Sequence, residues 1–208
     1  MALKICVLGS GSSGNSTLVM SNGRGLLIDA GLSAGETARR LGAVGVTLEM
    51  LDGVCVTHEH GDHTAGLKVL SQRHGLKLFA NSGTADAIRQ SGKTGTLPWN
   101  VFETGQSFKL AGMDIQAFSV PHDSYDPVGY VVSDGANCVG VATDIGTATT
   151  LVKERLKNCS VVVIEANHDE NMLKDSRRPW YLKQRIAGRQ GHMANRQTAD
   201  LLAEIWHP

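Results

Sequence analysis

Short apolar runs alternate with amphipathic stretches along most of the chain. Ten runs of four to seven residues are rich in Val, Ile, Leu and Ala and are bounded by turn-forming residues, which is typical of β-strands. The predicted strands cover residues 3–8, 17–20, 25–29, 51–57, 77–80, 107–110, 114–120, 127–132, 137–142 and 160–165. Six further stretches space their apolar residues as helices do. The predicted helices cover residues 33–41, 64–74, 84–90, 147–156, 179–186 and 195–206.

The order of these elements predicts an α/β fold. The first half of the chain is rich in strands with helices between them, and the second half repeats that order without repeating the sequence. Two sheets with helices on their outer faces account for this arrangement. Because 208 residues can bury most of their apolar surface in one core, we expect a single domain over residues 1–208.

Residues 57–63 read Thr-His-Glu-His-Gly-Asp-His and follow the predicted strand that begins at residue 51. Four metal-ligating side chains therefore fall within six residues: His58, His60, Asp62 and His63. Ligands at the end of a buried strand are held on a rigid element, and the turn after it lets them converge. Imidazole and carboxylate ligands without a thiolate suit zinc, manganese or iron. The alternative, a solvated polar loop, does not explain so many ligands together.

This His-x-His-x-Asp-His segment resembles the signature of the metallo-β-lactamase fold. Several shorter segments narrow the resemblance to the YycJ/WalJ branch, a bacterial group related to tRNase Z and to phosphodiesterases such as PhnP. They are Ser-Gly-Ser-Ser-Gly-Asn at 10–15, Pro-His-Asp at 121–123, Thr-Asp-Ile-Gly at 143–146, Glu-Ala-Asn-His-Asp at 165–169, Arg-Pro-Trp at 178–180 and Gly-His-Met-Ala-Asn at 191–195. The resemblance extends from about residue 3 to residue 202.

The resemblance implies a four-layer αβ/βα sandwich with two divalent metal ions, zinc or manganese, at one edge. His58 and His60 would bind the first ion, Asp62 and His63 the second, and His122 would be a later ligand. Asp144 would bridge the two ions, since each carboxylate oxygen can bind one. From the residues alone, His122 is equally a surface histidine, and Asp144 an N-cap for the helix that follows.

Other residues are implied to support or complete the site. Asp29 resembles an acid that orients a ligand histidine, although it also suits a turn. His192 lies where related phosphodiesterases carry a catalytic histidine that protonates the leaving group; the alternative is a solvated loop residue. His168 follows the strand that ends at Glu165, and we expect both near the site, Glu165 as a supporting group. Asp62 and His168 are placed with His192 among the catalytic candidates.

In relatives, a last strand ends in a final histidine ligand and another helix covers it. This sequence stops at His207 and Pro208, directly after a predicted helix. No strand precedes His207, so it is a poor substitute for that ligand. We therefore expect a sandwich that lacks its last strand and helix, and a second metal site that is incomplete.

Composition adds limits on the environment of the protein. Hydrophobic residues make up 41% of the chain and charged residues 19%, which is ordinary for a soluble globular protein. No apolar run approaches the twenty residues of a membrane span, and the first residues lack a signal-peptide pattern. The four cysteines form no CxxC pair and are expected to be small buried side chains in a reducing compartment. We expect a cytoplasmic protein that contacts no membrane; its oligomeric state is left open.

The net charge is zero, but its distribution is uneven. Residues 171–196 hold seven basic residues against one acid, together with Trp180 and Tyr181, which can stack on bases. Arg177 and Arg178 are the substrate-binding candidates in this segment, because basic side chains neutralise phosphates. The alternative is an exposed, solvated helix face.

The loop at residues 10–16 is the second candidate for substrate binding. It offers small residues and a flexible backbone whose N–H groups can cradle a phosphate. Ser12, Ser13 and Asn15 are its candidate contacts. A plain hairpin turn is the alternative, and the loop lacks the Lys of a P-loop.

Together these features predict a metal-dependent phosphodiester hydrolase, a nuclease with DNA as its substrate. The resemblance implies exonuclease attack from a 5′ end. Two alternatives stay open: a hydrolase of a small ester, thioester or cyclic phosphate, and a metal-binding chain with little activity. The basic segment argues against a neutral ester.

Overall fold

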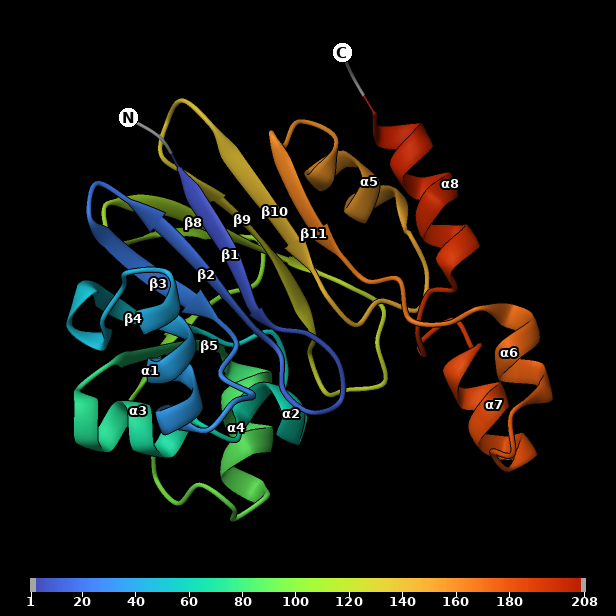
Figure 1. Ribbon diagram of the computed structural model, residues 1–208, viewed down its shortest axis with the longest axis horizontal. Coiled ribbons are helices and arrows are strands. Elements are labelled where there is room, and N and C mark those ends of the chain that lie inside the picture. The colour runs from blue at the N-terminus through green and yellow to red at the C-terminus, as the bar shows by residue number, and fades with distance from the viewer. Residues whose placement is uncertain (1–2, 207–208) are drawn as a thin grey trace.

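A computed structural model describes residues 3–206, which form two β-sheets lying face to face with helices on both outer sides (Figure 1). The first sheet has the order β1-β2-β3-β4-β5-β6. Its first three strands are antiparallel, and the pairs from β3 to β6 are parallel. The strands are β1 (Lys4–Gly9), β2 (Ser16–Ser21), β3 (Arg24–Ile28), β4 (Leu51–Cys55), β5 (Lys77–Asn81) and β6 (Trp99–Phe102).

The second sheet has the order β11-β10-β9-β8-β7. Its pairs are antiparallel except for β10 and β11, which run in the same direction. The strands are β7 (Ser107–Leu110), β8 (Met113–Ser119), β9 (Val128–Ser133), β10 (Cys138–Ala142) and β11 (Val161–Ile164). Because β10 and β11 are parallel, their C-terminal ends meet at the same edge of the sheet.

Helices complete the outer layers. On the side of the first sheet lie α1 (Ala34–Ala43), a short 3-10 helix at Leu48–Met50, α2 (Gly61–Thr64), α3 (Leu67–His74) and α4 (Ser82–Gln90). On the side of the second sheet lie α5 (Thr150–Leu156) and α8 (Asn195–Ile205), which contact each other. Two short helices, α6 (Glu170–Asp175) and α7 (Trp180–Ile186), form a hairpin that lies apart from both sheets (Figure 1).

Three apolar cores hold these layers together. They form because successive side chains along a strand point to opposite faces of the sheet. In β2, Leu18 and Met20 point to the core shared with α1, α3 and α4, whereas Val19 points between the two sheets. Tyr130 is fully buried between the sheets and donates to the carbonyl of Val56 at 2.6 Å. The third core joins the second sheet to α5 and α8, through residues such as Leu201. The predicted α/β class and the αβ/βα order of layers are confirmed.

Each predicted strand and helix has a counterpart, with ends shifted by a few residues. The predicted helix at 64–74 is in fact two helices, because a turn at Ala65 and Gly66 separates α2 from α3. Three elements were not predicted: β6, α6 and the 3-10 helix at Leu48–Met50. Two of the four residues of β6 are exposed and the other two are only partly buried, and α6 buries none of its residues, so neither has a clear apolar pattern.

The expectations of a missing last strand and of an unsuitable His207 both concern the end of the chain. Within residues 3–206 no strand follows α8, and β11 is the edge strand of its sheet. His207 lies outside the described residues.

None of the helices in the described part of the chain is long and apolar enough to cross a membrane.

Candidate metal centre

The candidate ligands gather where strands from both sheets end. His58, His60, Asp62 and His63 follow β4, and His122 follows β8, while Asp144 follows β10. A cleft of about 580 Å³ opens there, and its lining includes His60, Asp62, Asp144 and His192. The rings of His58, His63 and His122 lie behind these residues and are almost completely buried.

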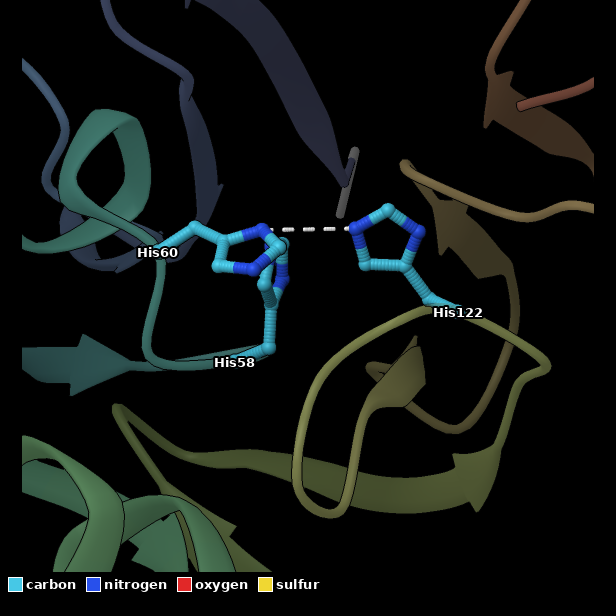
Figure 2. A group of neighbouring side chains, drawn as sticks. All are labelled: His58, His60 and His122. Carbon is cyan, nitrogen blue, oxygen red and sulfur yellow. Dashed lines mark hydrogen bonds between the residues drawn. The ribbon is translucent and has the colours of Figure 1, made fainter. Parts of the chain in front are cut away.

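Three imidazoles form the first group, as Figure 2 shows. The Nδ1 atom of His60 lies 3.0 Å from Nε2 of His58 and 3.4 Å from Nε2 of His122. One nitrogen from each ring thus points into a common space. Burial lowers the pKa of both His58 and His122, which favours the neutral form that binds metals. Three imidazoles with an open fourth position are the donor set of a catalytic zinc-type site.

A second group shares His58 and adds His63 and Asp144. Asp144 Oδ2 lies 2.5 Å from Nε2 of His63 and 3.8 Å from Nε2 of His58. Asp62 Oδ2 lies 3.7 Å from the same His63 nitrogen. Although burial opposes protonation, Asp29 and Asp144 raise the pKa of His63 to about 10. Together, the carboxylates of Asp29, Asp62 and Asp144 carry enough negative charge to hold a cation in place of that proton.

Asp29 contacts the second group through the Nδ1 atom of His63, on the opposite side of the ring from Asp144. Its Oδ2 lies 2.7 Å from Nδ1 of His63, and its Oδ1 accepts from the backbone N–H of Thr57 at 2.8 Å. The Thr57 hydroxyl donates to Asp29 at 2.8 Å and lies 2.9 Å from Nδ1 of His58. Sequence reasoning missed Thr57, since one hydroxyl beside a ligand motif carries no signal. The Asp29–Thr57 pair orients two rings at once.

Glu165 and His192 form a third group with Asp144. The Nδ1 atom of His192 lies 2.7 Å from Glu165 Oε1 and 3.3 Å from Asp144 Oδ1. These two acceptors, Asp144 first, raise the pKa of His192 to about 10. Glu165 Oε2 also accepts from the backbone N–H groups of Ile145 and Met193, at 3.0 and 3.3 Å. Glu165 therefore ties the segment of Asp144 to the segment of His192.

The structure places His168 differently from its companions. Its ring belongs to none of these three groups, which were searched among residues 3–206, and its Nδ1 faces the side chain of Asn167 at 3.3 Å. Its backbone carbonyl accepts from the N–H of Asn195 at 2.8 Å. His168 thus connects the end of β11 to the start of α8 through its backbone.

Asn15 contacts the candidate ligands directly. Its side-chain amide donates to Asp62 Oδ2 at 3.1 Å and lies 2.9 Å from Nε2 of His63. Its Oδ1 accepts from the N–H of Gly11 at 2.8 Å, which folds the loop back on itself. Ser12 lines the cleft, whereas Ser13 is exposed and is not among the lining residues. Asn15 therefore positions the side chains of Asp62 and His63.

The basic hairpin forms one wall of the cleft. Arg178 and Arg185 line it, while Arg177 is exposed and lies outside the lining. Arg185 donates to Asp123, whose other oxygen lies 3.4 Å from Nε2 of His122. The Asp123–Arg185 pair was not predicted, because the two residues are 62 positions apart in the sequence.

Comparisons with known proteins agree with this geometry. Residues 24–206 match a family model described as a beta-lactamase superfamily domain. The chain is 33% identical to exodeoxyribonuclease YycJ of Bacillus anthracis, over 99% of this chain and 78% of that protein. It is 34% identical to exodeoxyribonuclease WalJ of Streptococcus pneumoniae, over 97% and 76%. Among solved structures, the metallo-beta-lactamase fold protein YhfI of Bacillus subtilis aligns with a TM-score of 0.74 at 18% identity, over 99% and 83%.

Proposed function

The chain belongs to the beta-lactamase superfamily, with the metallo-β-lactamase fold, and on that premise we propose that it is a metal-dependent nuclease. The observation that carries the proposal is the convergence of three imidazoles and a buried carboxylate beneath a cleft with a basic wall. We take DNA as the substrate and a 5′ end as the point of attack. Support comes from two relatives named as exodeoxyribonucleases at about one-third identity.

The donor atoms suit two divalent cations, zinc or manganese. His58, His60 and His122 would hold the first, and His63 with Asp144 and Asp62 the second. Bound cations supply a polarised phosphoryl group and a water of lowered pKa. We expect the first site to be the tighter one, because burial favours the neutral form of His58 and His122, whereas His63 must give up the proton that it shares with Asp144.

We assign to His192 the role of assisting the leaving group. Glu165 and Asp144 both face its Nδ1, so Nε2 is the nitrogen left to donate a proton to an alkoxide. The same two carboxylates favour the protonated ring. A general acid of this kind typically contributes a factor of about 10²–10⁴ to the rate.

The charge of the cleft wall favours a polyanion over a neutral ester. The protein as a whole is neutral, yet residues 171–196 carry seven basic residues and one acid. Arg178 and Arg185 bring two of these charges to the cleft. We assign them to the phosphates that flank the scissile bond, and Arg177 to phosphates farther along the strand.

The test compares DNA strands labelled at the 5′ or the 3′ end, incubated with the protein and manganese or zinc. We expect mononucleotides to be released from the 5′ label first. The double change His58→Ala with His60→Ala should abolish this release and remove the tighter cation on elemental analysis. His74→Ala is the matched control, since His74 is an exposed histidine at the end of α3. Turnover of a small neutral ester without any hydrolysis of DNA would contradict the proposal.

A further inference from the structure

The α6–α7 hairpin has an exposed aromatic pair that packing does not explain. Trp180 is 68% exposed and Tyr181 is 71% exposed, and both lie in the first turn of α7. In the part of the chain that the structure describes, neither α6 nor α7 buries any residue. Figure 1 shows the hairpin standing apart from the sheets. Two neighbouring, exposed aromatic side chains of this size are a candidate interaction surface.

The position of this pair relates it to the cleft. Arg185 follows Tyr181 by four residues, so the two side chains share one face of α7, about 6 Å apart along its axis. Arg185 lines the cleft and pairs with Asp123, which lies beside His122. Leu182 and Ile186 face the same cleft. Tyr181 therefore stands about one helical turn from the cleft-lining Arg185, and Trp180 precedes it in the same turn of α7.

From this arrangement we infer that Trp180 and Tyr181 are a stacking platform for unpaired bases of a DNA strand whose backbone is led to the cleft by Arg178 and Arg185. The inference rests on the proposed nuclease function and deepens it, because it names the form of the substrate. Aromatic side chains stack on any base, but only on a base whose face is free, so the strand must be unpaired where it crosses the hairpin. Basic residues beside the pair match the phosphates between those bases.

Binding is measured without a cation, in the presence of a chelator, so that no catalysis is needed. The probe is a twelve-nucleotide single strand, compared with an abasic strand of the same length and charge and with a blunt duplex. We expect the double change Trp180→Ala with Tyr181→Ala to weaken binding of the single strand about tenfold. Its binding of the abasic strand should stay within about twofold, because that strand offers phosphates but no faces to stack on.

Two further variants control the measurement. Trp206→Ala removes another exposed tryptophan, at the end of α8, and should leave all three affinities unchanged. Trp180→Phe keeps an aromatic face, so it should retain most of the affinity while losing the quenching of tryptophan fluorescence that stacking produces. Circular dichroism checks that each variant is folded.

Several results would overturn the inference. Equal loss of the normal and the abasic strand would make the pair a structural support, and no loss of either would leave it without a role in DNA binding. If the double change instead dissolves a dimer in sedimentation, or removes binding to vesicles rich in phosphatidylserine, the surface belongs to a second copy or to a lipid. Failure of the wild-type chain to hydrolyse any DNA would count against the nuclease proposal instead, since the binding assay does not depend on hydrolysis.

Discussion

The buried acid Asp29 illustrates how single residues prepare this site. Its carboxylate contacts the ring of His63 and both the hydroxyl and the backbone N–H of Thr57. Asp29 adopts a left-handed backbone conformation, with φ of 63°. Only a few residue types tolerate this conformation, and Asp and Asn are among them. Replacement by Asn therefore changes the hydrogen bonds and leaves the backbone as it is.

We predict that Asp29→Asn weakens the affinity for the second cation by about 10- to 100-fold. An amide is uncharged and cannot hold the ring of His63 as a carboxylate does. Titration with a competing chelator measures the change. Asp52→Asn, at an acid that pairs with Arg24 on the surface, is the control and should leave the affinity unaltered. Unchanged affinity in Asp29→Asn would remove Asp29 from the support of the site.

Sequence patterns predicted the residues that carry metal-ligand chemistry and missed those that act through position. His58, His60 and His63 fall within one short motif, so their proximity follows from the sequence itself. Thr57 and Asp123 stand inside motifs, but their side chains pair with Asp29 and Arg185, which are distant in the sequence and are brought near only by the fold. His168 shows the converse: it lies in a motif with the right chemistry, yet its ring belongs to none of the three groups found among the described residues and faces Asn167.

At the scale of elements, the site depends on a close approach among three loops. A side chain at Gly31, in the loop after β3, would place its Cβ only 1.6 Å from the carbonyl oxygen of Asp62. The N–H of Asn15 donates to that same oxygen at 2.7 Å, and the N–H of Gly31 donates to the carbonyl of Asn15 at 2.9 Å. Three loops therefore meet where only glycine fits.

We predict that Gly31→Ala lowers the free energy of unfolding by about 1–3 kcal/mol, because the backbone of Asp62 must move to admit the methyl group. Urea denaturation measures the loss. Gly35→Ala is a matched control, since a Cβ there meets nothing within 4 Å and lies in α1, where Ala stabilises a helix by about 0.5–1 kcal/mol. Equal stability of the two variants would contradict the packing argument.

Elements with an apolar face were predictable, and elements without one were not. The strands β2 and β10 are buried along most of their length, and their β-branched runs show it. In contrast, β6 lies at the sheet edge with half its residues exposed, and α6 is set by its N-cap Asp169, whose side chain accepts from the N–H groups of Asn171 and Met172. A cap of this kind is a local signal, but it is weaker than a buried face.

For the whole molecule, the candidate metal centre lies between its two halves and takes residues from both. His58, His60 and His63 come from the first sheet, and His122 and Asp144 from the second. A cation held by both halves binds the folded state and not the unfolded chain. Cation binding should therefore stabilise the entire fold and not only one loop.

We predict that a cation at one hundred times its dissociation constant stabilises the protein by about 2.7 kcal/mol and raises the Tm by about 5–10 °C. Thermal unfolding with and without a chelator measures the shift. The double change His58→Ala with His60→Ala should show no shift with chelator. An identical Tm for wild-type protein under both conditions would mean that the cation does not join the two halves.

The pair of Asp123 with Arg185 has a consequence for how the protein would respond to its ligands. A strand phosphate that draws Arg185 away leaves Asp123 facing His122 without its counter-charge, and the negative potential at the cation site then becomes stronger. Thermodynamic reciprocity requires that whatever factor DNA adds to cation affinity, the cation adds to DNA affinity. Such a chain would be loaded most completely when both ligands are present, each acting as an allosteric effector of the other.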